Sequence, residues 1–170
     1  MKLKTIFISL LLLASTLAYS QTEKGKWHLS GSSSIQVANS SISVAGRTHS
    51  ATTIIFNPSV GYFVAKNFSL AMDMGVMSQD GETNFSVIPT ASYFFPTRSN
   101  LRPVAQVGVG YSHLSGYGRS SGVVVGAGIG VAYFASENIS VDIGMQYLYN
   151  NYDGDALNTI AGMVGFSVYF

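Results

Sequence analysis

Apolar and polar side chains alternate along almost all of the chain after residue 21. In the segment NFSLAMDMGVM, one face carries Phe68, Leu70, Met72, Met74 and Val76, and the other carries Ser69, Ala71, Asp73 and Gly75. This period of two is typical of β-strands, and the wider spacing of an amphipathic helix is absent. The alternation predicts eight strands, at residues 27–37, 52–64, 67–77, 83–95, 101–112, 121–134, 138–149 and 160–170.

Short connectors alternate with mostly longer polar ones. The short ones are residues 65–67, 96–100 and 135–138, and the longer loops contain many Ser, Gly and Asn residues. Asn67 and Asn138 precede the incoming strands of two similar hairpins, and asparagine tolerates the left-handed backbone that such turns use. Eight antiparallel strands could form a sandwich, a lipocalin-like barrel or a membrane barrel.

The size of the residues on each face favours the membrane barrel. The large apolar residues share one face, with Tyr and Phe near the strand ends, while the other face carries Ser, Thr, Gly, Ala, Gln and Asn. Small side chains suit the narrow interior of an eight-stranded barrel, and a large apolar face suits lipid. We therefore predict an all-β protein, an eight-stranded antiparallel up-and-down transmembrane β-barrel, with Phe68, Val125 and Phe166 pointing outward.

The composition supports this prediction and excludes several functions. Only 10% of the residues are charged, against about 25% in a typical soluble domain. The formal charge of +1 gives no basic surface for nucleic acid, and the absence of cysteine excludes disulfides and zinc–thiolate sites. We expect no cofactor and no metal ion.

The first residues have the three parts of a secretory signal. Two lysines in MKLK precede the apolar stretch IFISLLLLA, and the small residues Ala18 and Ser20 follow. The apolar stretch is shorter than the roughly 20 residues of a membrane-spanning helix, which argues against an anchor. We predict a signal peptide at residues 1–20, cleaved after Ser20, and a barrel domain at residues 21–170.

This combination resembles bacterial outer-membrane β-barrel proteins. The stretches KGKWHLSGSSS and NPSVGYFVAKNFSLAMDMG and the terminal phenylalanine are similar to the small outer-membrane β-barrel-domain family, with barrels like those of outer membrane proteins A and X. The resemblance implies the outer membrane of a Gram-negative cell, a monomer and contacts with outer-membrane lipid and lipopolysaccharide. It also implies that the barrel-assembly machinery recognises the last strand, through Phe166, Val168 and Phe170.

Three charged residues fall on positions that face the lumen: Asp73, Arg102 and Asp142. A charge inside a narrow barrel is costly unless it is paired. One hypothesis is that Arg102 and Asp142 meet across the lumen and plug or gate it. The alternative is that lumen water solvates each charge separately.

Other candidates for chemistry are weaker. His113 and Ser115 share one face and loosely resemble the His-x-Ser pair of outer-membrane lipid A deacylases, but no acidic residue on the next strand could complete a triad. His28 and His49 have no partner at ligand spacing. The glycines of GAGIG, residues 126–130, lie within a strand pattern, which argues against a dinucleotide loop. The stretches 80–82 and 153–155 could bind calcium weakly but favour turns.

The expected function is that of a non-enzymatic barrel in the outer membrane. It would serve envelope structure or binding through its surface loops, with a narrow or plugged lumen. A narrow porin-like channel is the alternative, although wide aqueous pores need 16–18 strands. A lipid A-modifying enzyme is a third possibility.

Overall fold

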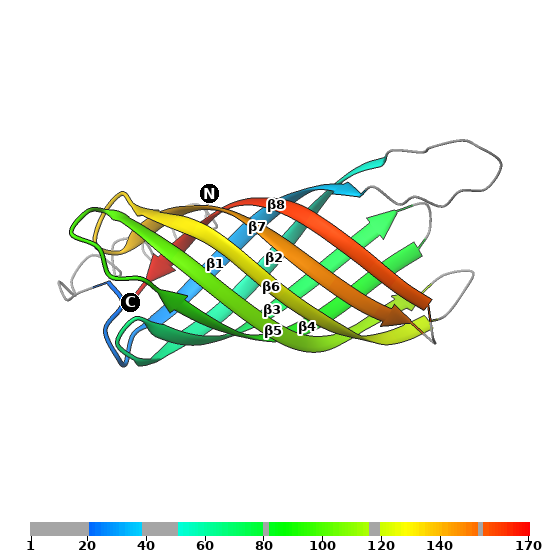
Figure 1. Cartoon of the computed structure of the whole chain (residues 1–170), viewed down its shortest axis with the longest axis horizontal. Coiled ribbons are helices and arrows are strands. Elements are labelled where there is room, and N and C mark those ends of the chain that lie inside the picture. Colours follow the sequence, from blue (N-terminus) through cyan, green and yellow to red (C-terminus); the bar gives the residue numbers. More distant parts are fainter. Residues whose placement is uncertain (1–20, 39–50, 80–81, 116–119, 153–154) are drawn as a thin grey trace, which may run out of the picture.

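The chain folds as one closed barrel of eight antiparallel strands, which confirms the predicted fold class (Figure 1). The computed structural model describes residues 21–38, 51–79, 82–115, 120–152 and 155–170. Each strand pairs with its sequence neighbours, and β1 pairs with β8 to close the barrel. The strands are β1 (Trp27–Ala38), β2 (Ala51–Ala65), β3 (Phe68–Gln79), β4 (Glu82–Phe94), β5 (Leu101–Ser115), β6 (Ser120–Phe134), β7 (Ile139–Tyr152) and β8 (Asp155–Tyr169).

Several strands run further than the alternation predicts. The stretch between the predicted strands 138–149 and 160–170 is largely strand, because the pairing of β7 with β8 continues to Tyr152 and Asp155. The strand β5 likewise continues to Ser115. Backbone hydrogen bonds hold these extensions and do not need one apolar face, so the alternation of side chains gave no sign of them.

The outer face of the barrel is apolar, as predicted. Val125 and Phe166 are exposed, and Ile129 on β6 has the largest exposed fraction of the large apolar residues, at 70%. The glycines of GAGIG occupy three of the inner positions of β6, and this stretch is strand, as predicted. A Cβ at Gly130 would lie 2.7 Å from the carbonyl oxygen of Ile143, so glycine allows β6 and β7 to approach there.

The two ends of the barrel differ (Figure 1). At the turn end, the connections 66–67, 95–100 and 135–138 are short, and the C-terminus lies beside them. Asn67 has a φ of 63°, the left-handed conformation expected there. The opposite end, where residues 39–50, 80–81, 116–119 and 153–154 connect the strands, is called the loop end below. The predicted signal peptide, residues 1–20, lies outside the described residues.

No helix in the described part of the chain is long and apolar enough to cross a membrane.

Candidate functional site

A cavity of about 300 Å³ lies inside the barrel. Its wall combines hydroxyl, amide and glycine positions with apolar side chains such as Met74, Ile88 and Val124. Phe94 and Tyr169 contribute to it at the turn end, and Asn84 and Asn150 contribute toward the loop end. Its polar lining includes His28, Ser30, Asn57, Ser59, Asp73, Ser86, Thr90, Ser92, Gln106, Ser112, Asp142, Gln146, Thr159 and Ser167.

Two carboxylates line this cavity, Asp73 and Asp142, and both were candidates from the sequence. The Thr90 hydroxyl donates to Asp73 Oδ2 at 2.7 Å. Asp142 accepts hydrogen bonds from Ser140 at 2.7 Å and from Ser167 at 2.5 Å. Among the described residues, no lysine, arginine or histidine forms an ion pair with either carboxylate.

A cluster of aromatic rings, which we call the plug, fills the lumen at the turn end. Phe63, Phe94, Phe134 and Tyr169 are buried and pack as one cluster. The ring centroids of Phe63 and Phe94 are 5.4 Å apart, and those of Phe134 and Tyr169 are 5.1 Å apart. Phe63 also contacts Tyr169 at 6.2 Å, so the rings form a continuous chain. Such packing leaves little room for solute at this level.

The sequence analysis missed the plug, although the chain carries a signal for it. The dipeptide Tyr-Phe occurs at 62–63, 93–94, 133–134 and 169–170, at the turn end of β2, β4, β6 and β8. Because successive residues of a strand point to opposite faces, each dipeptide directs one ring outward and one ring into the lumen. In the first three the phenylalanine points inward, and in the last the tyrosine does.

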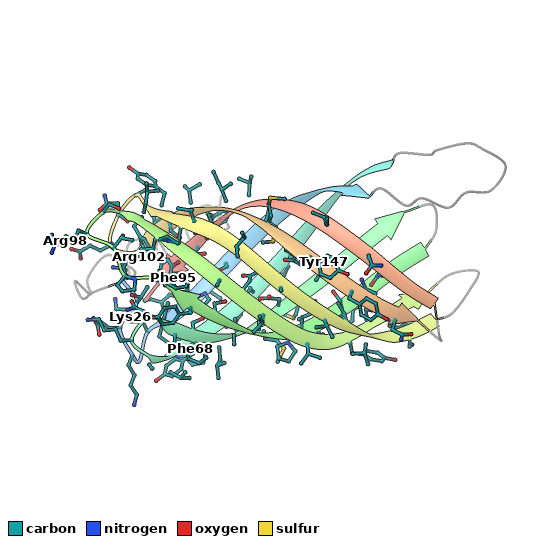
Figure 2. The ribbon with its side chains drawn as sticks, viewed as in Figure 1. Lys26, Phe68, Phe95, Arg98, Arg102 and Tyr147 are labelled. Carbon is teal, nitrogen blue, oxygen red and sulfur yellow. The ribbon has the colours of Figure 1, made fainter. Side chains whose placement is uncertain are left out.

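Arg102 belongs to the plug and not to the cavity. Its Cζ lies 5.2 Å from the centroid of the Phe134 ring, which is a cation–π contact. Its Nη1 donates to the Thr22 hydroxyl and, at 3.5 Å, to Asn67 Oδ1. Figure 2 shows Arg102 at the turn end of the barrel, near Phe95.

A direct ion pair between Arg102 and Asp142 is not confirmed, and a contact between them through a water molecule stays a prediction. No ion pair joins them in the described part of the chain, where Asp142 is bound by two serines and Arg102 by Thr22, Asn67 and Phe134. The physical reason is the segment before β1, residues 21–26, which supplies polar partners at the turn end. Separate solvation of Asp73 and Asp142 by lumen water stays a prediction.

The segment at residues 21–26 covers the turn end. Thr22 is buried, and its hydroxyl donates to Asn67 Oδ1 at 2.5 Å while its carbonyl oxygen accepts from the Asn67 amide at 2.8 Å. The Gly25 amide donates to the Phe63 carbonyl at 2.9 Å. Lys26 is 9% exposed, and its Nζ has no hydrogen-bond partner among the described residues. These contacts fasten the segment beneath the plug.

His28 lines the cavity beside the plug. Its Nε2 lies 2.8 Å from the Ser69 hydroxyl and its Nδ1 lies 3.2 Å from the Ser30 hydroxyl. Its ring occupies the space beside Gly61, where an added Cβ would come within 2.1 Å of Nε2. His28 is therefore part of the packed lumen wall, held by two serines and packed beside Gly61.

His113 hydrogen-bonds to Ser121, although the sequence had suggested Ser115. Its Nδ1 lies 2.7 Å from the Ser121 hydroxyl, directly across the pairing of β5 with β6. By alternation with Tyr111, which is exposed, His113 lies on the outer face near the loop end. In the described part of the chain, no carboxylate is hydrogen-bonded to His113.

The described residues contain no group of three His, Cys, Asp or Glu side chains able to hold a metal ion. His49 and parts of both suggested calcium stretches, at 80–81 and 153–154, lie outside the described residues.

The terminal residues lie as the barrel closure requires. Phe166 and Phe170 are exposed on the outer face, and Val168 alternates with the buried Ser167 and Tyr169. Trp27 and Phe170 exchange two backbone hydrogen bonds, at 2.8 and 3.0 Å, where β1 begins and the chain ends. Recognition of this strand by the barrel-assembly machinery stays a prediction.

Comparisons with known proteins agree with this architecture. Residues 6–170 match the family described as outer membrane protein beta-barrel domain. The N-terminal β-barrel domain of Pseudomonas aeruginosa OprF is 18% identical and has a TM-score of 0.66, covering 86% of this chain and 98% of that one. Neisserial surface protein A is 19% identical with a TM-score of 0.65, covering 86% and 96%.

The outer membrane enzyme PagL shares the same fold. It is 14% identical with a TM-score of 0.52, covering 83% of this chain and 98% of that one. A search of curated proteins finds no match. At these identities the solved structures show the fold alone, so a barrel of this kind is compatible with more than one activity.

Proposed function

This chain belongs to the outer membrane protein β-barrel domain family, and from that premise we propose that it is a non-enzymatic barrel whose lumen is closed to solutes. It is a protein of the bacterial outer membrane. Its role would be structural within the envelope or would reside in binding by the loop end.

The plug is the observation that carries this proposal. Phe63 has no exposed surface, and its ring contacts Phe94, Tyr169 and His28. Rings from β2, β4, β6 and β8 thus meet from around the barrel at one level. Beneath them, Thr22 is bound to Asn67 and Arg102. A solute would have to displace both the rings and this segment, and packed interiors resist such rearrangement.

The outer surface supports contacts with lipid and lipopolysaccharide. Tyr93 and Phe95 form an edge-to-face pair with centroids 5.0 Å apart at the turn end, while Tyr111 and Tyr147 are exposed further toward the loop end. Aromatic residues near both ends of a lipid-facing band are typical of membrane barrels. We propose a monomer, with its turn end in the periplasm and its last strand, through Phe166, Val168 and Phe170, presented to the barrel-assembly machinery.

Conductance in planar lipid bilayers tests the closed lumen. The refolded wild-type protein is expected to show no steady solute-permeable openings. The double variant Phe63→Ala/Phe94→Ala removes two neighbouring rings of the plug and is expected to produce openings. Leu70→Ala/Phe85→Ala, which changes two exposed residues of the outer face, is the control and is expected to behave as the wild type.

Steady openings of the wild-type protein would overturn the proposal and support the narrow porin-like channel. A heat-modifiable band on a denaturing gel shows in each case that the barrel has folded.

The pair of His113 and Ser121 motivates a second candidate, a lipid A-modifying enzyme. An imidazole 2.7 Å from a hydroxyl is within reach for activating it. The mass of lipid A from cells that express the protein decides between the two. Unchanged lipid A mass supports the non-enzymatic proposal, whereas a mass change that is lost in His113→Ala supports the enzyme.

A further inference from the structure

We infer that one anionic phospholipid binds along a groove on the outer face of the barrel, with its phosphate at the turn end. The phosphate contacts Lys24 and Lys66, and an acyl chain follows the groove toward the loop end. This site deepens the proposed contacts with outer-membrane lipid, and it rests on the proposed orientation with the turn end in the periplasm. The bound lipid therefore belongs to the periplasmic leaflet.

An apolar groove of about 970 Å³ crosses the outer face. Its central residues form one row across neighbouring strands, in which each residue is paired with the next: Trp27, Tyr62, Leu70, Ala91, Val107, Ala127 and Tyr147. Ala91 and Ala127 have the smallest side chains of the row, whereas aromatic rings lie at its two ends. This arrangement fits an elongated apolar ligand.

The row rises from the turn end to the middle of the barrel. Trp27 is the first residue of β1, Ala127 lies at the middle of β6, and Tyr147 lies further toward the loop end (Figure 2). Adjacent strands are about 4.8 Å apart, so the path from Tyr62 on β2 to Ala127 on β6 measures about 19 Å. The hydrocarbon of one leaflet is roughly 15 Å thick. An oblique acyl chain with its headgroup at the turn end would thus reach the middle of the bilayer.

Charge selects the lipid, because apolar contact cannot. Lipid tails are as apolar as the groove, so the groove orders a chain without distinguishing one headgroup from another. The lysines and arginines of the described residues all lie at the turn end: Lys24, Lys26, Lys66, Arg98 and Arg102. The described carboxylates at that end are fewer: Glu23, Glu137 and Asp142. The turn end therefore carries an excess of positive charge, which attracts anionic headgroups.

Two exposed lysines lie beside the turn end of the groove. Lys24 precedes Gly25, where an added Cβ would be 4.0 Å from the Tyr62 hydroxyl. Lys66 lies in the turn after β2, and its ion pair with Glu23 at 2.8 Å joins this turn to residues 21–26. That pair is exposed and therefore weak. An ammonium group has three N–H donors, so Lys66 can bind a phosphate as well.

Two aromatic rings mark the level of the headgroup. The ring centroids of Trp27 and Tyr62 are 5.0 Å apart, and Trp27 is half-exposed on the outer face. Tryptophan and tyrosine in such positions lie at the boundary between hydrocarbon and headgroups. Lys24 and Lys66 lie beyond this pair, where the phosphate would be, and the groove lies on its hydrocarbon side.

Quenching of Trp27 fluorescence by brominated lipids tests the inference, because Trp27 lines the groove and is the only tryptophan of the chain. The protein is refolded in phosphatidylcholine vesicles that contain a minor fraction of brominated phosphatidylglycerol or, for comparison, of brominated phosphatidylcholine. Phosphatidylglycerol is expected to quench more strongly, with a relative affinity at least about fivefold higher, because one basic residue near a membrane contributes about that factor.

Charge variants locate the phosphate. Lys24→Gln and Lys66→Gln are each expected to lower the preference for phosphatidylglycerol at least about twofold. Glu23→Gln is expected to raise it, since Lys66 then loses a competing carboxylate. Arg98→Gln is the matched control, because it removes an exposed cation from the turn between β4 and β5, and β5 lies opposite β1 in the barrel. This variant is expected to keep the wild-type preference.

A second pair of variants tests the groove. Ala91→Phe fills it with a ring and is expected to lower the preference for phosphatidylglycerol at Trp27. Val87→Phe, on the same face of β4 but outside the groove, is the control and is expected to behave as the wild type. A heat-modifiable band shows that each variant has folded.

Equal quenching of the wild type by the two brominated lipids would overturn the inference. So would an unchanged preference in both Lys24→Gln and Lys66→Gln. Weak quenching by both lipids, together with cross-linked dimers, would show that a second copy of the chain covers the groove, and this also overturns it.

The orientation is measured separately with Lys24→Cys, since the chain has no other cysteine. A membrane-impermeant maleimide is expected to label this variant only after the outer membrane has been permeabilised. Labelling in intact cells would overturn the placement in the periplasmic leaflet. A missing lipid preference leaves both this labelling and the bilayer conductance unchanged, so failure of the lipid site is distinguishable from failure of the proposed function.

Discussion

The two halves of the lumen differ in how their side chains fill the barrel interior. At the turn end, four aromatic rings and the buried Thr22 fill the space. Above them, hydroxyls, amides and glycines leave a cavity of about 300 Å³. The strands are continuous through both halves, so the difference lies in the side chains of the inner row alone. Both halves nevertheless obey the same alternation of inward and outward residues.

This difference shows that the residues facing the lumen have two separate roles. Where rings meet, packing gives stability, and a loss of volume there leaves a hole. Where small polar groups line a cavity, water can replace a lost side chain. Substitutions at the plug should therefore be costly, and substitutions in the cavity wall should not.

The substitution Phe63→Ala should have the largest effect. It removes a fully buried ring that contacts Phe94, Tyr169 and His28, and such changes cost about 3–5 kcal/mol. Urea unfolding of the barrel in lipid vesicles measures the loss. Phe85→Ala on the outer face of β4 is the control, and its loss should be smaller because lipid can fill the space. Equal losses would contradict the view of the plug as a packed core.

Arg102→Gln should have an intermediate effect. It removes the cation–π contact with Phe134 and hydrogen bonds to Thr22 and Asn67, for a loss of about 1–2 kcal/mol in the same unfolding measurement. Limited proteolysis should also cut residues 21–26 faster, since their attachment is weakened. Arg98→Gln, in an exposed turn of the same end (Figure 2), should change neither quantity. A matching loss in both variants would show that the net charge of the turn end matters and the contact does not.

The substitution Gln106→Ser should have the smallest effect. Gln106 lines the cavity, and water can occupy the volume that the shorter side chain leaves. We expect a change within about 0.5 kcal/mol in the free energy of unfolding. A loss of unfolding free energy close to that of Phe63→Ala would contradict the expectation that the plug and the cavity wall tolerate substitution differently.

Much of the fold was predictable because few arrangements of strands are stable in lipid. Apolar residues such as Leu70, Val125 and Phe166 recur at every second position of their strands. In hydrocarbon, a set of strands satisfies all its backbone hydrogen bonds only when it closes into a barrel. The strands extend further at the loop end than the sequence predicts, because pairing such as that of Tyr152 with Asp155 continues beyond the alternating stretch.

The candidate site was predictable in part. The lumen positions of Asp73 and Asp142 follow from the alternation of inward and outward residues along each strand, and the structure places both in the cavity wall. The partner of Arg102 does not follow, because Thr22 precedes the first strand and comes within reach only when that segment covers the turn end. The plug was indicated by the repeated Tyr-Phe dipeptides but was not recognised.

By itself, the sequence determined which side of each strand faces lipid, because a period of two and the size of the side chains are local properties. Only the tertiary structure decided which inner residues meet. Phe63, Phe94, Phe134 and Tyr169 become neighbours, and Arg102 hydrogen-bonds to Thr22, through closure of β1 on β8 and the placement of residues 21–26. Such contacts join strands far apart in the chain, so they depend on barrel register and tilt, which local patterning does not specify.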